Sequence, residues 1–273
     1  WMDDIWLFLF DDPAAARQAQ RELQNAAQEV GLHLNSAKTD LLEGPHVAEE
    51  ALNIEHSAVD EAIEDEADFG KLEEMIARII DDPDHAGRTT VRFAVARMLK
   101  HGVTYREQDL VAVAPRMPHV ADTLARLFKA RFTTGSLQDW FKEYAESDWA
   151  SFSWAVAQYG RMFASGVKPR QATREFFMEK LSDVDTELQL AALSAQRLAE
   201  WDAANCRALI ADVMRRTDNP HPRRVLSLAG LAAGTQPRTV RNWLRIQPEN
   251  ATTLEYLNSV GFHAPRTRPT FAR

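Results

Sequence analysis

The sequence has little cysteine and no long apolar run. Its 273 residues include one cysteine, Cys206, which excludes an internal disulfide framework and a cysteine-rich zinc site and fits a reducing cytosol. Cys206 falls within an apolar helical pattern, which favours a structural over a nucleophilic role. The scarcity of cysteine thus leads us to expect a cytoplasmic protein. No apolar run approaches the roughly 20 residues that cross a bilayer, so we expect no membrane contact. The chain does not begin with methionine, and its first residues read as mid-domain, so we expect an N-terminal part to precede them.

Basic residues are scarce in the first part of the chain. Residues 1–66 contain 16 Asp and Glu but only 3 Lys and Arg, whereas residues 67–273 contain 24 and 29, within a total net charge of −8. Residues 206–273 hold 11 Arg, no Lys and 4 Asp and Glu. The overall acidity therefore does not exclude nucleic-acid binding by the end of the chain. An apolar fraction of 45% excludes whole-chain disorder.

The hydrophobic pattern also changes near residue 66. The wholly apolar run 5–10 predicts a buried strand, residues 14–30 predict a helix, and residues 32–35 predict a second strand. We therefore expect residues 1–54 to be a small α/β fragment with the order strand–helix–strand. The acidic residues 55–66 are expected to form a linker.

Residues 67–273 are expected to form an all-helical domain, which makes the fold mostly α. Proline marks many of the breaks, and apolar residues recur at spacings of three and four. Helical pairs of this kind would suit an armadillo- or HEAT-like solenoid, with a plain helical bundle as the alternative. The predicted helices are 68–80, 88–101, 105–114, 118–132, 136–146, 148–164, 169–181, 185–200, 202–216, 221–233, 237–246 and 251–260.

Two adjacent carboxylates, Asp3 and Asp4, come directly before the first predicted strand. At a hairpin tip such a pair can present oxygens to a hard cation such as Mg²⁺ or Mn²⁺, as in two-metal sites for phosphoryl transfer. Adjacent aspartates are also common in ordinary turns, so the pair alone does not define a site.

A lysine follows the second predicted strand in the run Gly31-Leu32-His33-Leu34-Asn35-Ser36-Ala37-Lys38-Thr39. Lys38 could act as a general acid toward a departing pyrophosphate. A solvated lysine is the ordinary alternative, but Lys38 is one of only three basic residues in its region.

Together, these elements resemble the end of a reverse transcriptase palm. Trp1-Met2-Asp3-Asp4 is similar to the family's Tyr-x-Asp-Asp motif, and the run 31–39 is similar to its Gly-Leu-x-x-Asn-x-x-Lys-Thr motif, in the same order and at an appropriate spacing. The resemblance covers residues 1–44. It implies an RNA-directed DNA polymerase in which Asp3 binds the catalytic metal, Asp4 supports it and Lys38 is the general acid.

The sequence departs from this family in two respects. Trp1 stands where the family usually has Tyr or Phe, which keeps an aromatic ring but changes any nucleotide contact there. The palm strand that supplies the other metal-binding aspartate lies upstream of residue 1. We therefore expect the chain by itself to be inactive as a polymerase, and its partners within the whole protein to be dNTP and primer, template or product DNA.

The long helical remainder resembles the abortive-infection and other defence-associated bacterial reverse transcriptases, which implies a role in antiphage defence. The sequence neither requires nor excludes assembly into a homo-oligomer. Arg238, Arg241 and Arg245 fall on one predicted helical face, opposite Val240 and Leu244, and could hold phosphates. A solvated helix face is the alternative. The further candidates for nucleic-acid contact are Arg215, Arg216, Arg223 and Arg224.

Aromatic clusters in the helical region could stack bases, but at helical spacing they favour core packing. These clusters are Trp140-Phe141, Trp149 to Trp154 and Phe176-Phe177. Two further hypotheses compete with the polymerase. One is a non-catalytic helical scaffold, and the other is a degenerate polymerase that only binds nucleic acid.

Overall fold

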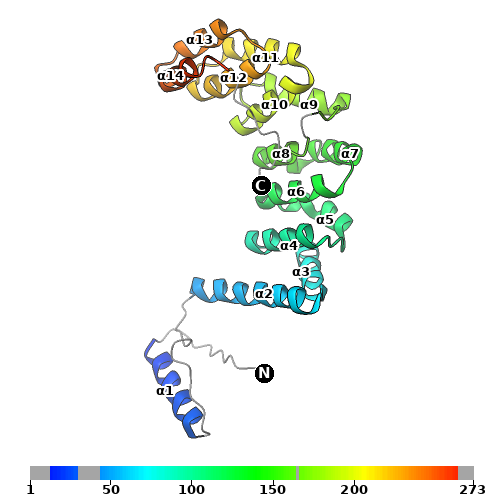
Figure 1. Ribbon diagram of the computed structural model, residues 1–273, viewed down its shortest axis with the longest axis vertical. Helices are drawn as coiled ribbons and strands as arrows, with labels where there is room; N and C mark the ends of the chain where they lie inside the picture. Colours follow the sequence, from blue (N-terminus) through cyan, green and yellow to red (C-terminus); the bar gives the residue numbers. More distant parts are fainter. Residues whose placement is uncertain (1–12, 30–43, 164–165, 264–273) are drawn as a thin grey trace. The chain divides into compact units, whose positions relative to one another are not determined.

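The computed structural model describes residues 13–29, 44–163 and 166–263, which are mostly helical and contain no β-strand (Figure 1). The chain divides into two compact units, residues 1–61 and 62–273. The described helices are α1 (Pro13–Glu29), α2 (Gly44–Glu66), α3 (Gly70–Asp81), α4 (Arg88–His101), α5 (Glu107–Val113), α6 (Ala121–Arg131), α7 (Thr134–Ala145), α8 (Ser153–Gly160), α9 (Gln171–Ser182), α10 (Leu188–Trp201), α11 (Ala203–Arg216), α12 (Pro220–Ala232), α13 (Pro237–Arg245) and α14 (Ala251–Ser259), with short 3₁₀ helices η1 (Ala114–Arg116), η2 (Pro118–Val120), η3 (Asp148–Ser151) and η4 (Pro248–Asn250).

The N-terminal unit contains α1 and most of α2. Helix α1 agrees with the helix predicted over 14–30. The strands predicted at 5–10 and 32–35 lie outside the described residues, so the α/β fragment stays a prediction.

Helix α2 differs from the sequence interpretation, which made residues 55–66 an acidic linker. These residues are the second half of a continuous helix, and Ala62 and Ile63 are buried. The physical reason is visible in the sequence: Leu52, Val59 and Ile63 recur at helical spacing, and Ala and Glu are strong helix formers. Eight carboxylates share this helix with no Lys or Arg, which gave the segment its linker-like composition.

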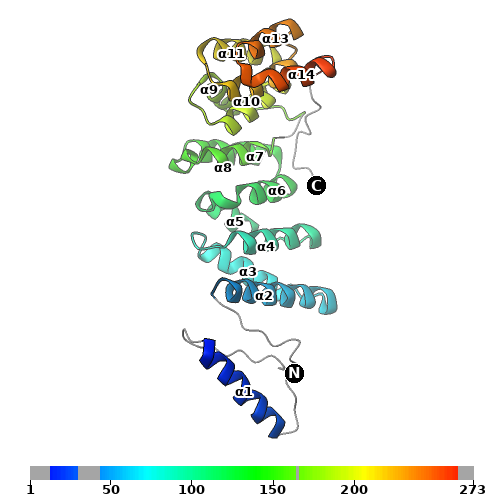
Figure 2. The same ribbon diagram turned by 90° about the vertical axis from the view of Figure 1, so that its left-hand side faces the viewer.

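The C-terminal unit is a serial stack of helices (Figures 1 and 2). Its substantial helix–helix contacts join helices that are adjacent or next but one in the chain. Helices α4, α6, α8, α10 and α12 form one continuous row, and α7, α9 and α11 form part of a second row. Helix α13 then packs on α12, and α14 packs on α13. Neighbour-only packing of this kind is typical of an α-solenoid and differs from a bundle, in which helices share one central core.

Aromatic rings fill the middle of the stack, as the sequence predicts for two of the three clusters. The Trp140 ring lies 4.7 Å from Tyr159 and 5.4 Å from Phe128, centroid to centroid. Phe141 and Phe177 are buried 5.7 Å apart. These contacts join α6, α7, α8 and α9, and at such distances aromatic pairs add to the stability that burial provides.

The third aromatic cluster is different. Trp149 and Phe152, in η3 and directly after it, are 39% and 50% exposed. Core packing is therefore wrong for these two residues, because they lie in a 3₁₀ turn between α7 and α8 and not on a helical face.

A half-buried arginine joins three helices near the start of this unit. Arg131, at the end of α6, donates from Nη2 to the carbonyl oxygens of Met98 at 2.8 Å and Val103 at 3.3 Å. Its Nε lies 3.1 Å from Oε1 of Glu107 in α5. Burial raises the pKa of Glu107, and the Arg131 charge opposes that rise. The guanidinium thus satisfies the carbonyls at the end of α4 while it fixes α5 and α6.

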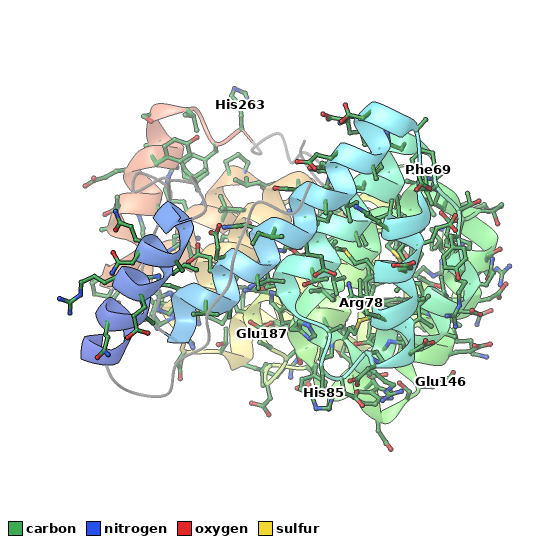
Figure 3. The ribbon with its side chains drawn as sticks, turned by 90° about the horizontal axis from the view of Figure 1, so that it is seen from below. Phe69, Arg78, His85, Glu146, Glu187 and His263 are labelled. Carbon is green, nitrogen blue, oxygen red and sulfur yellow. The ribbon has the colours of Figure 1, made fainter. Side chains whose placement is uncertain are left out.

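Side chains cap several helices and so fix where they begin. Glu187, labelled in Figure 3, accepts hydrogen bonds from the backbone N–H groups of Gln189 at 3.1 Å and Leu190 at 3.3 Å at the start of α10. Asp202 caps α11 and Asn219 caps α12 in the same way. Each cap satisfies an N–H group that has no partner within its own helix.

A close approach between helices in the middle of the stack depends on Gly160, the last residue of α8. A Cβ atom at this position would lie 2.6 Å from Cδ2 of Leu193 in α10 and 3.0 Å from Cζ of Phe177 in α9. Both neighbours are buried, so they have little room to move.

We expect Gly160→Ala to lower the free energy of unfolding by about 1–3 kcal/mol, because the added methyl overpacks this site. The matched control is Gly135→Ala in the first turn of α7, where the nearest atom would be Arg170 Nη2 at an ordinary 3.5 Å. There we expect no loss and a gain of at most about 1 kcal/mol. Urea unfolding followed by circular dichroism measures both, and equal stability of the two variants would contradict the proposed overpacking.

Candidate nucleic-acid interface

The residues assigned to polymerase chemistry, Asp3, Asp4 and Lys38, lie outside the described residues. The helix predicted between the two motifs is present as α1. The seven arginines assigned to nucleic-acid contact all lie in the C-terminal unit, on or beside helices α11, α12 and α13.

Helix α13 has the two faces that the sequence predicts. Val240 and Leu244 are 0% and 1% exposed, in a core cluster with Leu231, Leu257 and Phe262. Arg238 and Arg245 lie on the opposite face and are exposed. Pro237 begins the helix, where its missing N–H group costs no hydrogen bond.

Arg241 shares the basic face but is held in place. Its guanidinium carbon lies 4.6 Å from the centroid of the Phe262 ring, and its Nη2 donates to Oδ1 of Asn258 at 3.3 Å. A cation over an aromatic face is attracted by the negative potential of the ring. Sequence reasoning missed Asn258 and Phe262, because nothing in the local pattern of α13 indicates which residues of the following helix face it.

Arg215 and Arg216, at the end of α11, share a carboxylate. Asp212 Oδ1 lies 2.8 Å from Arg215 Nη2, and Asp212 Oδ2 lies 2.7 Å from Arg216 Nη2. The hydrogen bond from Arg216 is the main cause that lowers the pKa of Asp212. Arg216 Nη2 also donates to the carbonyl oxygen of Ser182 at 2.6 Å. One negative charge therefore offsets half of the positive charge at this position.

Arg223 and Arg224 have contacts within the fold. Arg223 is 3% exposed and donates to the carbonyl oxygen of Thr217 at 2.7 Å, which ties the start of α12 to the end of α11. Arg224 donates to Oδ1 of the buried Asn250 at 3.1 Å and to the carbonyl oxygen of Glu249 at 3.1 Å. Of the seven arginines, Arg223 is the one that does not face solvent. The structure thus brings Arg238, Arg241 and Arg245 together and places the other four elsewhere.

The described residues contain no group of three or more His, Cys, Asp or Glu side chains that could hold a metal ion. The histidines are dispersed, as His85 and His263 illustrate in Figure 3. In the same part of the chain, no helix combines the length and the apolar character that crossing a bilayer requires. No protein-family model, curated protein or solved structure matches the chain.

The single thiol is enclosed by the fold. Cys206 is buried, and its Sγ donates to the carbonyl oxygen of Ala195 at 3.4 Å. Burial raises the pKa of the thiol to about 12. Both features oppose nucleophilic reactivity, because the thiolate is the reactive form.

We expect a thiol-reactive dye at pH 8 to label the native protein at least about 100-fold more slowly than the unfolded protein, whose thiol has an ordinary pKa of about 8.5. Since Cys206 is the only cysteine, the absorbance of the released dye reports this site alone. The same protein in guanidinium chloride is the control. Equal rates in the two states would contradict burial of the thiol.

We expect Arg223→Ala to destabilise the protein by about 2 kcal/mol, because it removes a buried side chain and its hydrogen bond to Thr217. Arg215→Ala is the matched control: its side chain is 71% exposed, and its loss should change stability by less than about 0.5 kcal/mol. Thermal or urea unfolding separates the two. A loss of stability in Arg215→Ala without one in Arg223→Ala would contradict the stabilising role of Arg223.

Proposed function

We propose that this chain is the C-terminal portion of an RNA-directed DNA polymerase that acts in antiphage defence in the cytoplasm. The observation that carries the proposal is the ordered pair of motifs, Trp1-Met2-Asp3-Asp4 and the run from Gly31 to Thr39, at the spacing found in reverse transcriptase palms. The presence of helix α1 between them supports the order strand–helix–strand. The proposed reaction is nucleotidyl transfer from a dNTP to a 3′-hydroxyl group.

Asp3 and Asp4 fit a divalent cation by the chemistry of their donor atoms, since Mg²⁺ and Mn²⁺ prefer carboxylate oxygens. When bound, such an ion activates the 3′-hydroxyl group and neutralises charge on the phosphates. In this proposal Asp3 is the metal ligand, Asp4 supports it and Lys38 supplies the proton to the leaving pyrophosphate. The remaining ligands come from the part of the polymerase upstream of residue 1.

The helical unit is assigned to nucleic-acid contact through α13. Its exposed face carries Arg238, Arg241 and Arg245, and the nine residues of the helix contain no carboxylate. Arginine at exposed positions with helical spacing provides the charge and the planar donor groups that phosphate binding requires.

Two other functions differ from the polymerase in what they require of Asp3 and Asp4. A helical scaffold without catalysis requires neither carboxylate at positions 3 and 4, and an incidental acidic turn suits it. A degenerate polymerase keeps nucleic-acid affinity, which then does not depend on a divalent ion.

We expect Asp3→Ala in the full-length polymerase to reduce DNA synthesis by at least about 1,000-fold, because it removes a ligand of the catalytic ion. Asp65→Ala, at an exposed carboxylate near the end of α2, is the control and should leave the rate unchanged. The assay is incorporation of labelled dNTP with Mg²⁺ or Mn²⁺. Synthesis by Asp3→Ala at the normal rate would reject the polymerase. A wild-type protein that binds nucleic acid without a divalent ion and makes no DNA would instead support the degenerate polymerase.

A further inference from the structure

The exposed face of α13 is rich in arginine and has no acidic or aromatic side chain. At 100° per residue, its solvent-facing arc consists of Arg238, Arg241, Asn242, Arg245 and Ile246, with three positive charges and neither a carboxylate nor an aromatic ring. At 1.5 Å per residue, the seven-residue separation of Arg238 and Arg245 corresponds to about 10 Å along the helix. One strand of B-DNA advances 3.4 Å per phosphate along the duplex axis, so a helix parallel to that axis spans the rise of about three phosphates over this distance.

The aromatic rings near this face are engaged in packing. The Trp243 ring lies against α12, where Cζ3 would be 3.2 Å from a Cβ atom added at Gly230. Phe262 is 6% exposed and lies beneath Arg241. Tyr256 is 58% exposed, but it stands two residues from Asn258, which contacts Arg241, and therefore points about 160° away from it around α14. Among the described residues, the basic face thus has no Trp, Tyr or Phe ring on which a base could stack.

The three arginines differ in how firmly contacts within the fold hold their side chains. Among the described residues, Arg238 and Arg245 have no hydrogen-bond or ion-pair partner, whereas Asn258 and Phe262 hold Arg241. Two free guanidinium groups can each turn a planar pair of N–H donors toward a phosphate. The held guanidinium between them adds a fixed positive charge.

From these features we infer that α13 binds the sugar–phosphate backbone of nucleic acid through its guanidinium groups and does not stack its bases. The inference rests on the proposed nucleic-acid role of this unit and specifies how that role is performed. Backbone contact carries no sequence information, and its affinity depends strongly on salt because it releases counterions. Since a duplex has the higher charge density, it should bind more tightly than a single strand of equal length.

The test is fluorescence anisotropy of the 273-residue chain with labelled 20-mers over a series of salt concentrations. The probes are two duplexes of unrelated sequence and single strands of oligo(dT) and oligo(dA). We expect the two duplexes to agree within about twofold, the two single strands to agree within about threefold, and both duplexes to bind more tightly than either strand.

The Arg238→Ala/Arg245→Ala variant should lower the slope of log affinity against log salt by about 1.8 for duplex, which is 0.9 for each lost phosphate contact. Its affinity should fall by the same factor for both duplexes. Arg238→Lys/Arg245→Lys keeps the charge and should keep the slope, while it weakens binding through loss of the paired donors. The control is Arg88→Ala/Arg126→Ala, at exposed positions on α4 and α6, which should bind as wild type. Circular dichroism verifies that each variant is folded.

Base-dependent binding overturns the inference while leaving the proposed function in place. Its signature is a tenfold or greater difference between the two duplexes or between oligo(dT) and oligo(dA), or a loss in the Arg238→Ala/Arg245→Ala variant that is confined to one sequence. A wild-type chain that binds none of the probes at low salt contradicts the nucleic-acid role itself. The two failures are therefore distinguishable in one experiment.

Discussion

Each helix of the C-terminal unit must bury its apolar face against helices that are adjacent or next but one in the chain, and the rest of this unit depends on that constraint. Helices α4, α6, α8, α10 and α12 form a row in which every member supports the next. Stability is then a sum over interfaces and does not come from one shared core. This explains why single residues at the interfaces matter, such as Gly160 between α8 and its neighbours and Arg131 at the junction of α4, α5 and α6.

Much of this arrangement could be predicted from local pattern. Most helices of the C-terminal unit lie within a few residues of their predicted positions, because proline fixes the breaks and apolar spacing fixes the buried faces. The helix predicted over 148–164 is the exception, since it is divided into η3 and α8 and the latter ends at Gly160. Spacing also placed Arg238, Arg241 and Arg245 opposite Val240 and Leu244. The same information could not decide between a solenoid and a bundle, since it shows which face of a helix is buried but not which helix covers it.

Some features could not be predicted because they depend on contacts between residues distant in sequence. Helix α2 was not predicted because its many carboxylates obscure the helical spacing of its apolar residues. The local sequence pattern does not distinguish Arg223 from an exposed arginine. In the structure Arg223 is buried and donates to the carbonyl oxygen of Thr217, directly after α11. Arg224 is directed toward Asn250, which is 26 residues away. In α2 the apolar positions are regular, but eight carboxylates mask them. That acidic helix repels phosphates, because its carboxylates carry charge of the same sign.

The position of α13 and α14 in the stack has a consequence for binding energetics. Among the described residues, the main contacts of α14 are with α13 and η4, and this pair meets the middle of the unit chiefly through α12. In a serial stack, a pair with few interfaces opens more readily than a pair with many, and its amides exchange sooner with solvent. A ligand that binds only the ordered α13 shifts this opening equilibrium toward the closed form. Nucleic acid bound to α13 would then slow hydrogen exchange in α13 and, through the contacts of α13 with α12 and of α12 with α10, in those helices too.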